Sequence, residues 1–299
     1  MRRAVVILFL LLPWAAKAEH LFEAGVRAGL AGFDTRCEYV EPFAQMHAGL
    51  VLSYAYHSPY ILGLRCALNF DRHQAGFTKA GYSDTYTVID VENDPMQVDY
   101  SIGLLNERYT TYSVGIPLQL ALSYKGVNLY IGPKLVLPIS WSWTETAENC
   151  ELSVYYALQD NRVYDSYPLA ASRSFREGQN GTRNLPKTRF FLATEVCYDI
   201  LLSSGRFRKS YLSVGFYADY SLSRMEGDPS ERISLLMLSD TREGFPLHRI
   251  LTPVVAANRQ GKRLVNSLQP FALGLKISYR FGYTPQRTAS PRTCRCLLY

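Results

Sequence analysis

Long hydrophobic runs are almost absent from this sequence. Among its 299 residues, only one uninterrupted apolar run is present, at the N-terminus between Ala4 and Trp14. A bundle of membrane-spanning helices is therefore excluded, because each span needs about 20 predominantly apolar residues.

Cysteine is scarce too, and its spacing does not indicate a metal site. The six cysteines lie far apart except for Cys294 and Cys296, which have the wrong spacing for a zinc knuckle or a thioredoxin-type site. The acidic stretch 90–94 lacks the spacing and the glycine of a known calcium loop. We therefore expect no metal site and no cofactor, and the disulfide state of the cysteines stays open.

The N-terminal apolar run is typical of a secretory signal. Arg2 and Arg3 precede it, and Ala16-Lys17-Ala18 follows it as a small-x-small cleavage site. We predict a signal peptide over residues 1–18. Its removal takes away three basic residues and lowers the formal net charge from +6 to +3, so nucleic acid is not an expected partner.

Beyond residue 18, apolar and polar residues alternate with a period of two. The last segment is the clearest example, since Leu273, Leu275 and Ile277 alternate with Gly274 and Lys276. Because no segment carries a helical stripe, the pattern predicts an all-β chain. Eight segments show the alternation: 21–33, 43–56, 60–70, 109–124, 127–142, 188–202, 211–222 and 269–281.

The gaps between these segments are alternately long and short. The short gaps, at 57–59, 125–126 and 203–210, have the composition of hairpin turns. In an up-and-down barrel this alternation places every short turn at one end and every long loop at the other. Pro117, Pro133 and Pro138 interrupt two strands and predict local bulges. The long gaps are 34–42, 71–108, 143–187 and 223–268.

The lengths and faces of the segments favour a bilayer around the barrel. Each segment is long enough to cross hydrocarbon, which takes roughly 9 to 11 tilted residues. An open sheet edge in lipid would cost several kcal/mol for each unpaired backbone group, so the first and eighth strands must pair. We predict an eight-stranded antiparallel up-and-down transmembrane β-barrel over residues 19–281, with long extracellular loops and a flexible periplasmic tail over 282–299.

The face of small residues in these strands also carries charges of both signs. Side chains in a narrow lumen fill it, and opposite charges there are expected to pair. Glu23 with Lys276 or Arg280, across the closing seam, is the sharpest pairing prediction. By parity the interior set is Glu23, Arg27, Arg65, Lys134, Glu195, Asp199, Asp219, Lys276 and Arg280. Among the histidines, His47 is expected in the lumen, His57 in a periplasmic turn, and His73 and His248 in loops.

Aromatic residues gather near the strand ends on the apolar face, as in the girdles of membrane barrels. The predicted periplasmic girdle is Tyr56, Tyr60, Tyr124, Tyr198, Tyr279 and Phe281. The predicted outer girdle is Phe70, Tyr112, Trp141, Trp143, Phe190 and Tyr220.

Several stretches carry a family resemblance: Ala16-Lys17-Ala18, GVRAGL at 25–30, SVGIPL at 113–118, LYIGP at 129–133 and LKISYRF at 275–281. In these the sequence resembles the small outer-membrane β-barrel family of the Bacteroidetes type, the PorT-like "outer membrane protein beta-barrel domain" group, which is OmpA-like in architecture. The resemblance implies location in the cell outer membrane. It also implies recognition of a final aromatic residue, here Phe281, by the barrel-assembly machinery.

The expected function is non-enzymatic. No Gly-x-Ser-x-Gly or His-x-Ser-Asn cluster accompanies any histidine, so no catalytic residues are predicted. Instead the loops are expected to bind a protein or glycan ligand or to support the envelope or secretion. The tyrosine-rich run 82–88 suits recognition, and equally it suits a simple extension of the hairpin above the membrane. Two alternatives are open: an outer-membrane lipid-modifying enzyme, and a secreted lipocalin-like barrel with its apolar face inward.

Overall fold

The structure is a computed structural model of the chain. It describes residues 19–37, 39–57, 62–89, 95–156, 161–162, 175–182, 188–205, 208–226, 234–239, 248–259 and 262–283. Within these ranges no helix is long and apolar enough to span a membrane.

Eight long antiparallel strands close into a ring. Each strand pairs with the next, and β15 pairs with β1 from His20↔Tyr283 to Cys37↔Val265. The predicted up-and-down barrel and its closing seam are therefore confirmed. The strands are β1 (Glu19–Cys37), β2 (Glu41–His57), β3 (Leu62–Ile89), β4 (Pro95–Tyr124), β5 (Val127–Tyr156), β8 (Arg189–Ser204), β9 (Arg208–Ser221) and β15 (Val265–Tyr283).

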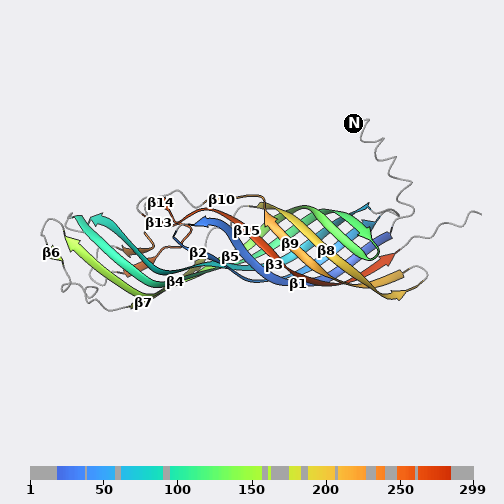
Figure 1. The fold of residues 1–299 in the computed structure, drawn as a ribbon, viewed down its shortest axis with the longest axis horizontal. Helices are drawn as coiled ribbons and strands as arrows, with labels where there is room; N and C mark the ends of the chain where they lie inside the picture. The colour runs from blue at the N-terminus through green and yellow to red at the C-terminus, as the bar shows by residue number, and fades with distance from the viewer. Residues whose placement is uncertain are drawn as a thin grey trace, which may run out of the picture.

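The long connections all lie at one end, and much of their length is strand. β3 and β4 keep one register from Leu62↔Leu122 to Ile89↔Pro95, whereas alternation on the sequence ends the third strand at Phe70. Figure 1 shows β4, β5 and β7 running far beyond the ring. We call this part the projecting sheet: residues 79–89, 95–105, 147–156 and β7 (Phe175–Thr182).

Short strands complete this end of the molecule. β6 (Asn161–Arg162) pairs with β5, and β10 (Met225–Glu226) pairs with β15. Two small hairpins follow in the chain: β11 (Leu236–Ser239) with β12 (His248–Leu251), and β13 (Asn258–Arg259) with β14 (Lys262–Arg263).

At the opposite end a tight turn joins β4 to β5. Its two residues, Lys125 and Gly126, have φ angles of 47° and 86°. Two central residues with positive φ match the twist of a two-residue hairpin, which explains the glycine at the second position. We refer to this end of the barrel as the turn end and to the other as the sheet end.

The apolar face of each strand points outward. In β15, Leu273, Leu275 and Ile277 are 48%, 52% and 51% exposed, whereas Lys276 and Arg280 are each 1% exposed. A lipocalin-like calyx requires the reverse orientation, so that alternative is wrong for this chain.

One expected bulge has a larger effect than the sequence pattern predicts. The β4–β5 register shifts by one residue, from Ser113↔Pro138 to Tyr112↔Ser140, next to Pro138. A one-residue shift exchanges the two faces of a strand. As a result Trp141 and Trp143 point inward, each 7% exposed, and their assignment to a lipid-facing girdle is wrong.

An apolar core lies between the projecting sheet and the segment 234–268. Tyr82, Tyr100 and Leu105 of the sheet pack with Leu236 and Val254 of that segment. The backbone N–H of Val254 also donates to Oε2 of Glu107 on β4 at 2.6 Å. The projecting sheet is therefore covered on one face and packed as part of a folded unit.

Candidate functional site

The nine charged residues expected in the lumen all lie inside the barrel. Eight of them are fully buried, and Asp199 is partly buried near the turn end. They divide into two groups, which we call the first and the second charge cluster. The first contains Glu23, Arg65, Glu195, Asp199, Lys276 and Arg280, and the second contains Arg27, Lys134 and Asp219 together with Asp71.

The first charge cluster crosses the closing seam. Nζ of Lys276 lies 2.7 Å from Oε1 of Glu23, and Nη2 of Arg280 lies 3.4 Å from Oε2 of Glu23. The predicted pair is therefore present with both cations. Arg65 joins Glu23 to Glu195, at 3.2 Å and 2.8 Å. Three carboxylates face three cations, so the formal charges cancel.

The ring of Tyr130 supports the first charge cluster from inside. The guanidinium carbons of Arg65 and Arg280 lie 4.7 Å and 5.2 Å from its centroid. Both guanidinium groups therefore contact the same aromatic ring, and the negative quadrupole of its π-system attracts cations. Tyr130 is fully buried and lies on β5, with its side chain in the lumen.

The second charge cluster lies closer to the sheet end. Arg27 binds Asp71 and also Asp219, the latter at 3.0 Å. Lys134 lies 3.1 Å from Asp71 and 2.7 Å from Asp219. Asp71 begins the gap that the sequence pattern assigns to a loop, and that assignment is wrong because β3 continues to Ile89.

Two glycines leave room for these buried charges. A Cβ atom on Gly49 would lie 2.2 Å from Oδ1 of Asp71, and one on Gly115 would lie 2.3 Å from Cε of Lys134. The small residues on the interior face therefore have a specific role: they accommodate the charged side chains of neighbouring strands.

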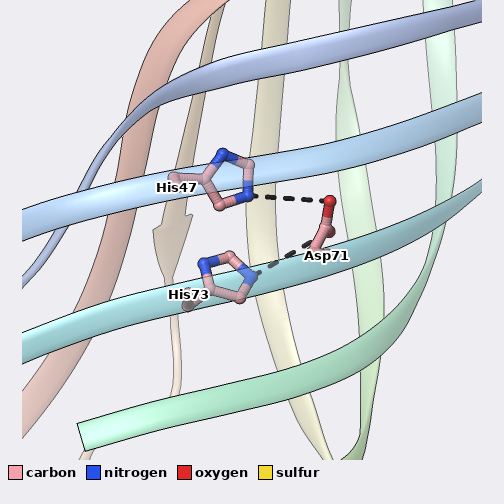
Figure 2. Close-up of side chains that lie close together, drawn as sticks. All are labelled: His47, Asp71 and His73. Atoms are coloured by element: carbon pink, nitrogen blue, oxygen red, sulfur yellow. Dashed lines mark ion pairs between the residues drawn. The ribbon is translucent and has the colours of Figure 1, made fainter.

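Two histidines lie beside Asp71, as Figure 2 shows. His47 of β2 and His73 of β3 are direct cross-strand partners, and Asp71 precedes His73 by two residues on the same face. Nε2 of His47 lies 3.6 Å from Oδ1 of Asp71, and Nε2 of His73 lies 3.9 Å from Oδ2. His47 is in the lumen as expected, whereas the expectation that His73 lies in a loop is wrong.

A hydroxyl and an imidazole meet at the turn end. Oγ of Ser123 lies 3.0 Å from Nδ1 of His57. Oγ of Ser123 also donates to Oδ1 of Asn128, at 2.6 Å, so this amide oxygen competes with the imidazole for the hydroxyl proton. Because an activating base must accept that proton, the competing acceptor weakens the pair as a nucleophile and its base.

The remaining girdle residues are mostly on the outer surface. Tyr124, Tyr198, Tyr279 and Phe281 are exposed near the turn end, and Tyr56 is partly exposed. Tyr60 lies outside the described residues. Toward the sheet end, the exposed aromatics of the predicted outer girdle are Phe70, Tyr112, Phe190 and Tyr220.

The projecting sheet has one buried and one polar face. Tyr82, in the run that suited either recognition or hairpin extension, is 2% exposed and packs near Tyr100, and the run is part of the extended strand β3. Burial raises the pKa of each phenol and of the Asp84 carboxyl. On the opposite face, Thr85 and Gln97 donate to Asp99 at 2.7 Å and 2.9 Å. The tyrosines therefore stabilise the sheet, and polar side chains face outward.

Comparisons with known proteins add a distant likeness in structure. No family model and no curated protein matches the chain. Ten solved chains match, among them the crystal structure of Ail, the attachment invasion locus protein of Yersinia pestis, in complex with the heparin analogue sucrose octasulfate. It has 10% sequence identity and a TM-score of 0.27, and the alignment covers 87% of this chain and 98% of that chain. At this level the likeness carries no argument about function, and the resemblance to the Bacteroidetes-type family stays a prediction.

Proposed function

We propose that this chain is a non-enzymatic integral protein of the cell outer membrane, with a sealed barrel and a ligand-binding sheet outside the cell. The observation that carries the proposal is the outward apolar surface around a closed ring. Aliphatic and aromatic side chains on every barrel strand are exposed, among them Val26, Leu50, Leu64, Leu118 and Leu275.

An aqueous environment does not suit this surface. Soluble monomers rarely expose a contiguous apolar patch larger than a few hundred Å². A closed ring of strands pairs all of its backbone groups internally, which is the condition for any β-structure in hydrocarbon. A bilayer is therefore the solvent that fits this exterior.

The interior favours a sealed barrel over a pore. Barrels of eight strands are just wide enough for side chains to fill the lumen. Here the two charge clusters span the lumen, since Arg27 on β1 reaches Asp71 on β3 and Asp219 on β9. We propose that these ion pairs hold opposite walls together and block flow.

The projecting sheet is the part best suited to binding. Its apolar face is covered, and its other face presents hydroxyl, amide and carboxylate groups from Ser83, Thr85, Gln97 and Asp99. Such groups recognise a protein or glycan surface by hydrogen bonds. Because the sheet is already folded, little binding energy is spent on ordering it.

The two ends of the chain fit the same proposal. A signal peptide over 1–18 exports the chain, and the barrel-assembly machinery reads an aromatic of the last strand. In the structure β15 runs past Phe281 to Tyr283, so the tail predicted to begin at residue 282 begins no earlier than residue 284, and we propose that 284–299 is periplasmic.

The membrane part is tested by cell fractionation and gel migration. The protein should appear in the outer-membrane fraction, and unboiled and boiled samples should migrate differently on a denaturing gel. In planar bilayers the native protein should show no steady conductance. Recovery of the exported protein in the detergent-free soluble fraction would refute the proposal.

The binding part is tested on cells that display the protein. Replacing Thr85 and Gln97 with Lys should abolish attachment to immobilised host proteins or glycans, while heat-modifiable migration is kept. Lys209→Glu, an exposed change at the turn end, is the matched control and should attach normally. If the Thr85 and Gln97 variant attaches as well as the native protein and the control, the polar face of the projecting sheet is not the binding surface.

A further inference from the structure

We propose that His47, His73 and Asp71 form a transition-metal site inside the barrel, with Cu²⁺ as its preferred ion. Their three potential ligand atoms all lie within 4.8 Å of one another. This inference rests on the barrel interior alone and does not depend on what the projecting sheet binds.

The strands place the three side chains without help from any loop. His47 and His73 face each other across the β2–β3 ladder, and Asp71 lies diagonally opposite His47 on the interior face. The ring centroids of the two histidines are 4.5 Å apart. A site built on paired strands is held more precisely than one on loops, which favours metal binding.

The nitrogen of His47 that faces Asp71 is available. Nδ1 of His47 contacts the hydroxyl of Tyr217, so its other nitrogen, Nε2, points toward the carboxylate. Among the described residues Nε2 has no partner at hydrogen-bond distance, because its neighbour, Oδ1 of Asp71, lies 3.6 Å away, and His47 is 0% exposed. A buried polar atom without a partner is costly, and a metal ion would satisfy it. Tyr217 then has the role of an outer-shell group that orients a metal-binding imidazole.

Asp71 keeps a lone pair for the ion. Oδ2 receives both Nη2 of Arg27 and Nζ of Lys134, whereas within the described part of the chain the hydrogen bond to Oδ1 comes from Nε of Arg27 alone, at 2.8 Å. A carboxylate oxygen can accept two such contacts. Oδ1, which is also the oxygen nearer His47, is therefore the ligand atom we assign.

Metal binding requires the ligand atoms to move closer together. In the tetragonal geometry of Cu²⁺, bonds of about 2.0 Å place neighbouring ligand atoms roughly 2.8 Å apart. In the structure Nε2 of His47 lies 3.6 Å from Oδ1 of Asp71, Nε2 of His73 lies 3.9 Å from Oδ2, and the three ligand atoms lie within 4.8 Å of one another. His73 also lines a cavity of about 60 Å³, which has room for water ligands on the His73 side, since one water needs roughly 10–15 Å³.

The surrounding charges select the ion. The charges of Arg27 and Lys134 are cancelled by Asp71 and Asp219, so the charge of an added ion is not compensated. Only a metal with a strong preference for imidazole can overcome this cost, and Cu²⁺ leads the divalent series. Ca²⁺ and Mg²⁺ prefer oxygen ligands and should not bind here. It also follows that removing Lys134 should strengthen binding.

The test uses the full mature protein folded in detergent and titrated with Cu²⁺ alone. Calorimetry should give one site, and electron paramagnetic resonance should show nitrogen coupling from two imidazoles. His73→Ala should weaken binding at least tenfold, and Tyr217→Phe about 10- to 100-fold, as for other outer-shell partners. His57→Ala, which removes an interior imidazole at the turn end, is the matched control and should bind as the native chain does.

Lys134→Met separates this site from adventitious copper binding. If the site is correct, the variant binds Cu²⁺ more tightly, because one opposing charge is gone. Heat-modifiable migration reports whether each variant is folded, and the spectrum of the native protein stands even if a variant does not fold. A native spectrum without nitrogen coupling, equal affinity in His73→Ala, or a matching heat of Ca²⁺ binding would each overturn the proposal.

Discussion

Lys276 makes the first charge cluster testable by a single change. Its ammonium group binds Glu23 at 2.7 Å and also Glu195, and the residue is 1% exposed. Lys276→Met keeps most of the side-chain volume but leaves three carboxylates facing two cations, Arg65 and Arg280. The variant should therefore fold into a less stable barrel.

The expected loss follows from burial. Removing one partner of a buried ion pair costs about 3–5 kcal/mol, because the remaining charge stays buried without compensation. At 1.4 kcal/mol for each tenfold change, the unfolding equilibrium should shift by roughly 10²- to 10⁴-fold. Glu195→Gln in the same chain restores neutrality and should recover more than half of the loss.

Urea unfolding in lipid vesicles, followed by tryptophan fluorescence, measures both quantities. The two single variants and the double variant form a cycle whose coupling energy isolates the Lys276–Glu195 interaction. Lys125→Met, in the exposed turn, is the control and should stay within about 0.5 kcal/mol of the native chain. A Lys276→Met barrel as stable as the control, or a double variant no better than the single one, would show that the interior charges do not hold the barrel together.

Three further predictions concern the corrected tryptophans, the apolar core and a buried carboxyl. Fluorescence of Trp141 and Trp143 should be insensitive to brominated lipid, whereas a Leu275→Trp variant should be strongly quenched; quenching of the native chain would return these tryptophans to the lipid face. Leu236→Ala, at a 0% exposed position, should destabilise the projecting sheet by about 2–5 kcal/mol and speed its proteolysis without changing heat-modifiable migration. Cleavage of the variant at the same rate as the native chain would show that Leu236 does not support the sheet. Burial raises the pKa of Asp84, so the folded sheet favours the protonated acid, and its stability should fall as pH rises through the unfolded pKa toward the folded one. Asp84→Asn should remove this dependence in hydrogen exchange, and an unchanged profile would exclude Asp84 as its source.

Alternation was sufficient to predict the barrel from the sequence. In β15 the period of two separates Leu275 from Lys276, and the structure exposes the first and buries the second. The short gap at 125–126 also marks the tight turn correctly. These features are local, because a strand with one lipid-facing side must alternate along its whole length.

The sheet end was harder to predict because its pattern depends on distant residues. Beyond Phe70 the strand β3 continues through Asp71 and His73. Outside the lipid layer the outward face of a strand need not be apolar, so the alternation is lost and the sequence there looks like that of a polar loop. The apolar cover of the projecting sheet comes from Leu236 and Val254, which follow Tyr82 and Tyr100 only after a long stretch of chain that includes β5, β8 and β9. The bulge near Pro138 exchanges the inward and outward faces of β5 beyond it, so Trp141 and Trp143 point inward although strict alternation assigns them to the outer face.

A different signal was present for the histidines. In a hairpin the position numbers of paired residues have a constant sum, and the turn between β2 and β3 pairs His57 with Gly63. This structural register pairs His47 with His73, whereas the predicted gap at 57–59 would pair position 56 with position 60 and position 47 with position 69. In both registers the odd-numbered positions of the two strands share one face. Extending the count past Phe70 would have placed both histidines and Asp71 on one interior face.

Continuous strands link the two halves of the molecule physically. β3, β4 and β5 are 28, 30 and 30 residues long, and each runs from the barrel wall into the projecting sheet. Because β3 and β4 keep one register throughout, the sheet cannot slip or rotate without breaking ladder hydrogen bonds in the barrel. The ion pairs that hold the barrel walls therefore also restrain the projecting sheet, and the proposed binding surface is already ordered when the chain has folded.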